Sequence, residues 1–351
     1  MTPGVRPGRP PRRRWLRRAG LSVLALVLFA GAAWAAWWLE TSWPKIPGGS
    51  PPVRLVVPPG ASADTIARQL HGLGLARHPI TFRMLARSRG VGGKLKAGEY
   101  ALSGPLSLEG ILDVLLRGDV VRRELTVTEG RSLDEVAALV AAEGMDLETF
   151  LAAARDPAPV RDLDPLARDL EGYLFPDTYD VPQSPEAPRA LVRRMALRFR
   201  EVVGSELPRI AERGMTVREV VTLASIVELE TARPAERPRI AAVFLNRLDR
   251  GMPLQTDPSI IYALKEAGRW DGNIRKADFD IDSPYNTYRR AGLPPGPIGS
   301  PGREAILAVL EPAPTKDLYF VSRNDGTHEF SETLEAHNRA VTRYQRRRAS
   351  S

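Results

Sequence analysis

The sequence predicts a mixed α+β protein with one N-terminal membrane-spanning helix, a small β-α-α-β module and a larger α+β domain. Three observations predict this arrangement: an uncharged apolar run near the N-terminus, a strand–turn–helix pattern that occurs twice, and capped amphipathic helices in the second half. The 351 residues, of which 43% are hydrophobic and 26% charged, are enough for more than one domain.

The distribution of charge argues against a nucleic-acid partner. The formal net charge is +8, but residues 1–20 alone contain seven arginines and no acidic residue. The other 331 residues hold 43 basic and 42 acidic side chains, so the body of the protein is near neutral. The chain has no cysteine, which excludes thiol nucleophiles, cysteine-ligated metals and disulfides.

Residues 21–39 predict a transmembrane helix. These 19 residues carry no charge, and at about 1.5 Å per residue they span roughly the hydrocarbon core of a bilayer. Arginines precede the run and none follows it directly, which predicts a cytoplasmic N-terminus and an outer or periplasmic location for the rest. A cleaved signal peptide is the alternative, because Ala33-Trp34-Ala35 offers small residues at cleavage-site spacing. We expect an anchor in a bacterial plasma membrane, since tryptophans crowd that site.

Composition divides the chain into six parts. We expect an Arg/Pro-rich cytoplasmic tail, a transmembrane helix, a Pro/Gly-rich linker, a small module, a large domain and a basic C-terminal tail. Their predicted bounds are 1–20, 21–39, 40–52, 53–119, 120–345 and 346–351.

A strand–turn–helix pattern recurs at an offset of 70 residues. Each copy has a short strand, a glycine turn, an N-capping serine and an amphipathic helix that a glycine ends. The capping serines are Ser62 and Ser132, and Glu135 completes a capping box in the second copy. The repeat predicts two related strand–helix units.

The first copy opens the small module. A second helix near residues 80–88, a strand at 98–102 and a helix after Ser107 complete it. This β-α-α-β order resembles LysM, the module that binds N-acetylated glycans. A spacer module without glycan contact is the alternative.

One helix of the large domain carries an unusual acidic side chain. Thr216 and Glu219 form a capping box that predicts the start of a helix, and this helix comprises the run 217–232. At about 100° per residue, Glu228 falls inside the apolar stripe of this helix. Such a carboxyl must pair with a cation (Arg233, Arg237 or Arg247), stay protonated, or face a cleft, and the last two suit a general acid. Glu230 lies at the edge of the stripe, where we expect it to be solvated.

Further segments of this domain combine polar and aromatic residues in rigid loops. Residues 171–179 hold two tyrosines, a phenylalanine and two acids, which suits either a carbohydrate cleft or a plain hydrophobic anchor. Asp257 before Pro258 is typical of a helix start. A helix is expected at 238–250, a hairpin turning at 324–326, and a final helix containing His337.

Five motifs together resemble the MltG (YceG-like) family of membrane-anchored endolytic murein transglycosylases. In chain order they are EGYLFPDTY (171–179), LASIVELET (223–231), VFLNRLDRGMPLQTDPSIIYAL (243–264), SPYNTYRRAGLPPGPIGSPG (283–302) and YFVSRNDGTHEFSETLEAHNRAV (319–341).

The resemblance implies a lyase that cuts peptidoglycan strands between N-acetylmuramic acid (MurNAc) and N-acetylglucosamine (GlcNAc). The product would carry a 1,6-anhydroMurNAc end, and the activity would limit the length of nascent strands beside cell-wall synthases. The resemblance also implies that the catalytic glutamate is Glu228. We expect neither cofactor nor metal, because the four histidines show no metal-ligand spacing. Substrate positioning is predicted for Glu171, Tyr173, Gln255, Asp257, Tyr285, Asn286, Thr287 and Tyr288.

Two other functions stay open from the sequence. A muramidase would cut the same bond with water and would need a second carboxylate, for which Asp257 is the strongest candidate. A scaffold that binds peptidoglycan without cleaving it would be indifferent to Glu228→Gln.

Overall fold

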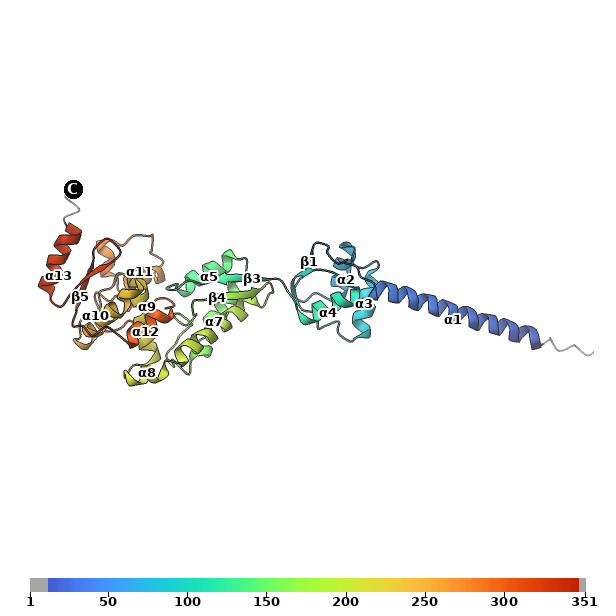
Figure 1. The fold of residues 1–351 in the computed structure, drawn as a ribbon, viewed down its shortest axis with the longest axis horizontal. Coiled ribbons are helices and arrows are strands. Elements are labelled where there is room, and N and C mark those ends of the chain that lie inside the picture. The colour runs from blue at the N-terminus through green and yellow to red at the C-terminus, as the bar shows by residue number, and fades with distance from the viewer. Residues whose placement is uncertain (1–11, 347–351) are drawn as a thin grey trace, which may run out of the picture. The chain divides into compact units, whose positions relative to one another are not determined.

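The computed structural model describes residues 12–346 and divides the chain into two compact units (Figure 1). The first unit comprises residues 1–122 with 182–185, and the second comprises 123–181 with 186–351. Most of the predicted N-terminal tail and nearly all of the C-terminal tail lie outside the described residues.

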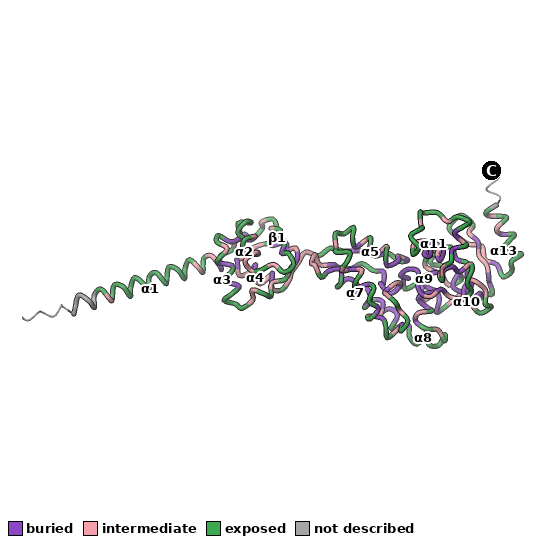
Figure 2. Tube along the Cα trace, turned by 180° about the vertical axis from the view of Figure 1, so that it is seen from behind, coloured by how far each residue is buried: buried purple, intermediate pink, exposed green. Residues whose placement is uncertain are grey.

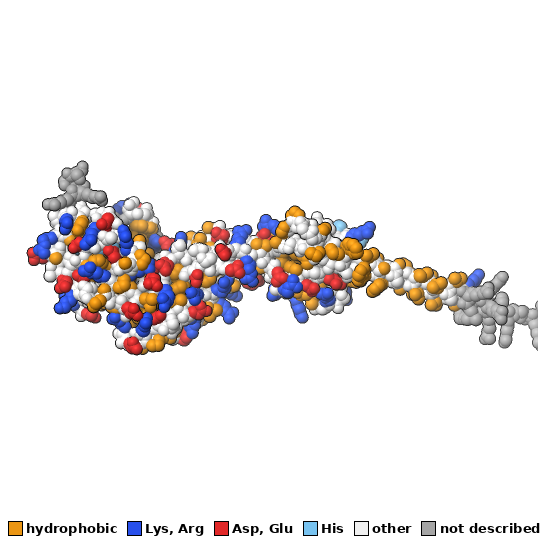
Figure 3. Space-filling model, viewed as in Figure 1, with side chains coloured by type: hydrophobic (Ala, Val, Ile, Leu, Met, Phe, Trp, Pro, Cys, Tyr) orange, Lys and Arg blue, Asp and Glu red, His pale blue; other side chains and the backbone are white. Residues whose placement is uncertain are grey.

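The first unit begins with the long helix α1 (Arg12–Ser42). From Arg18 to Ser42 it is long and apolar enough to cross a membrane, with a mean hydropathy of 2.0 in its most apolar stretch. Between Leu21 and Leu39 every large hydrophobic residue except Trp37 is exposed (Figures 2 and 3). At its C-terminal end, Trp37 packs against the core of the following module and Thr41 is buried.

The rest of the first unit is a β-α-α-β module followed by a helix. Its strands pair antiparallel, with Leu55 opposite Tyr100, and its helices cover a core that includes Phe82 and Leu112. The predicted element order is confirmed, and the likeness to LysM stays a prediction. The elements are β1 (Val53–Val57), α2 (Ala63–Gly72), α3 (Pro79–Ser88), β2 (Gly98–Leu102) and α4 (Leu108–Arg117).

Both copies of the predicted repeat form strand–turn–helix units with the expected caps. Ser62 caps α2 by accepting a hydrogen bond from Thr65 N, and Ser132 caps the matching helix α5 (Leu133–Ala142). Ser132 and Glu135 form the predicted capping box. Each serine follows a glycine with positive φ, +68° in the first copy and +78° in the second, which only glycine adopts without cost.

The second unit is mostly helical, with two two-stranded sheets. Helix α9 runs through its core and contacts α8, α10, α11 and α12. The hairpin β5–β6 turns at the predicted Asn324–Gly326. The remaining elements are β3 (Arg122–Thr126), α6 (Leu147–Ala154), η1 (Ala158–Val160), β4 (Thr178–Pro182), α7 (Ala187–Gly204), α8 (Leu207–Glu212), α9 (Val217–Glu230), η2 (Pro234–Glu236), α10 (Arg237–Asp249), α11 (Asp257–Glu266), η3 (Lys276–Asp280), α12 (Arg303–Leu310), β5 (Tyr319–Ser322), β6 (His328–Ser331), α13 (Leu334–Val341) and η4 (Thr342–Arg346).

Candidate active site

Helix α9 carries two glutamates at its C-terminal end. The predicted capping box of Thr216 and Glu219 starts the helix, and the backbone becomes extended at Thr231. Every residue from Val220 to Val227 is buried, so α9 is a core helix and not the one-sided amphipathic helix that the sequence predicts. Because successive residues turn by about 100°, Glu228 and Glu230 point to different sides of the helix.

The Glu228 carboxylate is held by two donors. One oxygen forms an ion pair with the Arg237 guanidinium, and the other accepts a hydrogen bond from Gly302 N at 3.0 Å. The Glu228 side chain is 5% exposed and that of Arg237 is 8% exposed. Of the environments that the sequence left open for Glu228, the structure shows pairing with a cation.

A third side chain closes the network around Glu228. Arg237 Nη2 also contacts Glu129 Oε2 at 3.3 Å. Burial, with Glu129 close by, raises the pKa of Glu228, while the Gly302 amide and Arg237 act in the opposite direction. A Cβ atom on Gly302 would lie 1.9 Å from Glu129 Oε1, so a larger residue here would displace the Glu129 side chain. The network is ion-paired, and it reaches the surface through Glu129, whose side chain is 46% exposed.

Glu230 has a different environment. Its carboxylate accepts a hydrogen bond from Thr256 Oγ1 at 2.8 Å, and burial raises the pKa of Glu230 to about 7. The charge of Asp257 raises this pKa further, whereas His328 and Arg247 lower it. The expectation that Glu230 is solvated was wrong, because the chain before α11 folds over the end of α9 and removes water from this carboxyl.

The segment that covers Glu230 has a constrained backbone. Gln255 has φ = +51°, one of two positive values for non-glycine residues in the described chain. Its N–H donates to Thr287 O at 3.1 Å, and Thr256 N donates to Thr287 Oγ1 at 3.1 Å. Asn286 and Thr287 are buried beneath it. Backbone strain of this kind is concentrated at functional sites in proteins.

Exposed polar groups surround Glu230. Gln255 and Asp257 are exposed, and Tyr288 donates its hydroxyl hydrogen bond to Asp257 Oδ1 at 2.6 Å. Beneath them, the buried Arg247 donates to the carbonyls of Leu254 and Leu318 at 2.7 Å each. A carboxyl with a pKa raised in this way can hold and release a proton, and the Asp257 carboxylate and Tyr288 phenol beside it can bind sugar hydroxyls.

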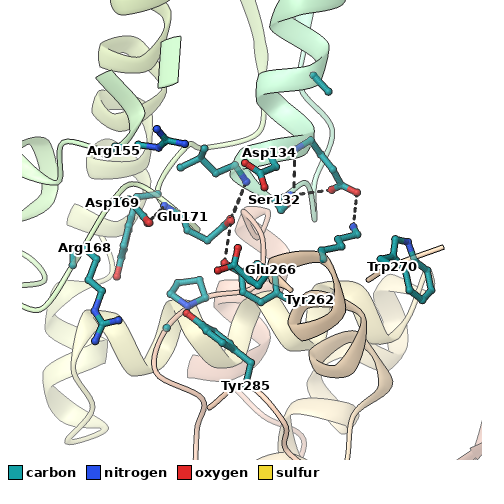
Figure 4. A pocket seen from close by; sticks show the side chains of 18 of the residues that line it. Ser132, Asp134, Arg155, Arg168, Asp169, Glu171, Tyr262, Glu266, Trp270 and Tyr285 are labelled. Atoms are coloured by element: carbon teal, nitrogen blue, oxygen red, sulfur yellow. Dashed lines mark hydrogen bonds and ion pairs between the residues drawn. The ribbon is translucent and has the colours of Figure 1, made fainter. Parts of the chain in front are cut away.

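A cavity of about 700 Å³ lies elsewhere in the second unit (Figure 4). Glu171 faces it, accepts hydrogen bonds from Leu133 N at 3.0 Å and from Tyr262 Oη at 3.4 Å, and has its pKa raised by burial to about 8. Tyr285 stacks beside Tyr262 on the cavity wall, with ring centroids 4.7 Å apart. Carboxyls and aromatic rings thus line a space large enough for sugar rings.

The sequence matches the YceG-like family over residues 55–343, which cover both the module and the helical unit. The chain belongs to the YceG-like family.

Relatives of known name and structure agree with this assignment. The chain is 33% identical to an endolytic murein transglycosylase of Bacillus subtilis over 312 residues, which are 83% of this chain and 84% of the relative. An endolytic murein transglycosylase of Streptococcus pneumoniae is also 33% identical, and the match spans 58% of its length. A crystal structure of a yceG-like protein from Listeria monocytogenes superposes with a TM-score of 0.57 at 29% identity, covering 83% of this chain and all of that one.

The YceG-like fold separates the predicted site residues into three places. Glu171, Tyr173 and Tyr285 line the cavity, although the Tyr173 hydroxyl is engaged with Asp164 at 2.5 Å. Gln255, Asp257 and Tyr288 lie around Glu230, and Asn286 and Thr287 lie below them. Glu228 has its own network with Arg237.

Sequence reasoning missed the environment of Glu230 and the role of Arg237 as the cation between two carboxylates. Arg237 was one of three arginines considered for Glu228, and α9 was expected to leave Glu230 in water. The one available signal was the second acid of the run ELET, two residues after Glu228, followed later by a Thr–Asp–Pro helix start.

Proposed function

We propose that this YceG-like chain is a lytic transglycosylase that cuts within peptidoglycan strands, between MurNAc and GlcNAc, and leaves a 1,6-anhydroMurNAc end. The names of the B. subtilis and S. pneumoniae relatives support the reaction class. The observation that carries the proposal in this chain is the Glu230 carboxyl, which lies beneath Thr256 beside the exposed Gln255 and Asp257 and whose pKa burial raises to about 7.

The sequence predicts Glu228, at the C-terminal end of α9, as the proton-transferring carboxyl, and Glu230 lies two residues beyond it. Between the two glutamates there, the contacts favour Glu230. Burial raises the pKa of both, but the two oxygens of Glu228 already accept charged or backbone donors, whereas Glu230 accepts one neutral hydroxyl. A carboxyl without a fixed cation is freer to donate a proton and take it back.

The reaction uses this carboxyl twice. Protonated Glu230 donates its proton to the glycosidic oxygen, and the bond from that oxygen to C1 of MurNAc breaks. The 6-hydroxyl of the same MurNAc attacks C1, and the Glu230 carboxylate takes the hydroxyl proton, so no water is consumed. Because nucleophile and electrophile share one sugar, the ring closure is intramolecular and needs no second carboxylate.

The other predicted residues take supporting roles in this proposal. Gln255, Asp257 and Tyr288 bind hydroxyl or N-acetyl groups beside the scissile bond, and Asn286 and Thr287 position that loop from below. Glu171 and Tyr285 contact sugars in the cavity, with Tyr173 supporting its wall. Glu228 and Arg237 hold the end of α9 in place.

Helix α1 anchors the enzyme in the plasma membrane, with its N-terminus in the cytoplasm and the small module and the second unit on the outer face. The arginines that precede the apolar run and the length of α1 support this topology. An anchored enzyme reaches strands as they leave the membrane, so it would limit nascent strand length near cell-wall synthases.

A muramidase is the second candidate, and one observation favours it. Asp257 lies close enough to Glu230 to raise its pKa, so a second carboxylate is available beside the acid. The hydrogen bond from Tyr288 holds one oxygen of Asp257, which argues for a binding role instead.

Product analysis separates these functions. Purified full-length chain is incubated with uncrosslinked glycan strands, and the ends formed are identified by mass spectrometry. We expect anhydro ends from the wild type and from Glu148→Gln, a control at an exposed glutamate on α6, and none from Glu230→Gln. Reducing ends would identify a muramidase, and intact strands with the wild type would identify a non-catalytic scaffold.

A further inference from the structure

Helix α3 presents an exposed apolar line that the catalytic proposal does not use. Ile80 and Met84, one turn apart, are 50% and 52% exposed, and Leu73 in the preceding turn is 42% exposed. The opposite face of α3 is buried through Phe82 and Leu85. Ile80 and Met84 thus form an exposed apolar pair on one face of α3.

The same region is strongly cationic. Residues 65–98 contain seven arginines and lysines and no acidic residue. Arg83 pairs with Asp64 at 3.1 Å and Arg89 pairs with Asp113 at 2.6 Å. Within the described part of the chain, Arg77 and Arg87 form no ion pair, and Arg87 follows Met84 by three residues on the outer face of α3. The apolar line is therefore flanked by uncompensated positive charge.

This region lies where α1 enters the module. Arg77 N donates to Glu40 Oε1 at 2.7 Å, directly after the apolar run of α1 ends at Leu39. Helix α1 also contacts α3, and Figure 1 shows α3 at the end of the module where α1 enters. Trp38 and Trp43 are 48% and 60% exposed at the same junction, as is typical of a membrane interface.

We propose that the outer face of α3 lies on the anionic lipid surface that surrounds α1. Ile80 and Met84 enter the headgroup region, and Arg77 and Arg87 bind lipid phosphates. The occupant is a lipid surface because the face combines apolar and cationic groups beside a membrane-spanning helix. The inference rests on the membrane anchor in the proposed function and adds a second attachment that fixes the module at the bilayer.

The absence of cysteine makes the test direct, because any single cysteine is a unique labelling site. Full-length Met84→Cys, labelled with a fluorophore, is placed in phosphatidylcholine nanodiscs with or without phosphatidylglycerol and a headgroup-attached nitroxide quencher. Ala101→Cys, exposed on β2 of the same module, is the matched control. We expect several-fold stronger quenching at position 84 than at 101, dependent on phosphatidylglycerol and reduced by Arg77→Gln with Arg87→Gln.

Equal quenching at positions 84 and 101 would overturn the proposal. The proposal would also be overturned if quenching at 84 stayed the same without phosphatidylglycerol and in the Arg77→Gln with Arg87→Gln variant, because the proposed contact is with an anionic surface. A probe at Leu28→Cys, in the middle of α1, reports the anchor with an acyl-chain quencher. Loss of quenching at 28 identifies failure of the anchor itself, whereas quenching at 28 without quenching at 84 refutes only the α3 contact.

Discussion

The last turn of α9 carries two carboxyl groups on different sides of the helix, and their partners differ. On one side, Glu228 is paired with Arg237 and a backbone amide, next to the half-exposed Glu129. On the other, Glu230 meets a neutral hydroxyl under a strained, exposed loop. A buried carboxylate with a fixed cation stabilises one geometry, whereas a desolvated carboxyl with a hydroxyl partner can exchange a proton. We propose that Glu228 is a structural acid and that Glu230, two residues further on, transfers the proton.

The largest effect on stability is expected on the Glu228 side. Glu228→Gln leaves the buried Arg237 without its main counter-charge, so the free energy of unfolding should fall by about 3 kcal/mol. Urea denaturation of the detergent-solubilised chain measures it. The double variant Glu228→Met with Arg237→Met is the control and should recover most of the loss. A fall below about 0.5 kcal/mol for Glu228→Gln would show that the pair is not structural.

Glu230 should determine how the rate of strand cleavage depends on pH. Because its pKa is raised to about 7, the acid form is lost as pH rises, and the rate of strand cleavage should fall about tenfold per pH unit above that value. The raised pKa of Glu230 also makes the stability of the fold depend on pH. Its contribution to the free energy of unfolding is fully present below pH 4.5, the pKa of the unfolded chain, and is lost as pH rises through about 7. Glu230→Gln should therefore flatten the stability profile between these values, and an unchanged profile would contradict the assignment.

A smaller effect on the pH profile is expected from removing the hydroxyl partner of Glu230. Thr256 Oγ1 donates to the carboxylate and so favours its charged form. Thr256→Val should raise the pKa of Glu230 and move the alkaline limb of the rate profile to higher pH, at a cost of about 1 kcal/mol in stability. Ser259→Ala, which removes a neighbouring hydroxyl bonded to Thr287, is the control and should leave the limb in place.

The smallest expected effect concerns the strained loop. Gln255→Gly relieves a positive φ, so stability should stay level or rise by up to about 1 kcal/mol. If the Gln255 side chain binds the strand, KM rises while the fold is unharmed. An increase in stability with unchanged KM and kcat would remove Gln255 from the binding surface.

Local features of the fold follow from the sequence, whereas the surroundings of the two glutamates do not. The serine caps of the repeat and the Asn324–Gly326 turn depend on residues a few positions apart, and both were predicted. Helix phase also shows that Glu228 faces the interior. The environment of Glu230 depends on Thr256, 26 residues later, and on a loop fixed by Thr287. The periodicity of hydrophobic residues along a helix says nothing about contacts with residues far along the chain. For this reason the prediction that Glu230 is solvated was wrong.

The most direct test compares initial rates of anhydro-end formation by Glu228→Gln and Glu230→Gln at one pH near 6. Both rates are measured at a temperature where circular dichroism shows each variant folded. We predict a loss of about 10³-fold or more for Glu230→Gln and a loss within about tenfold for Glu228→Gln. The reverse ranking would contradict the account and return the catalytic role to Glu228.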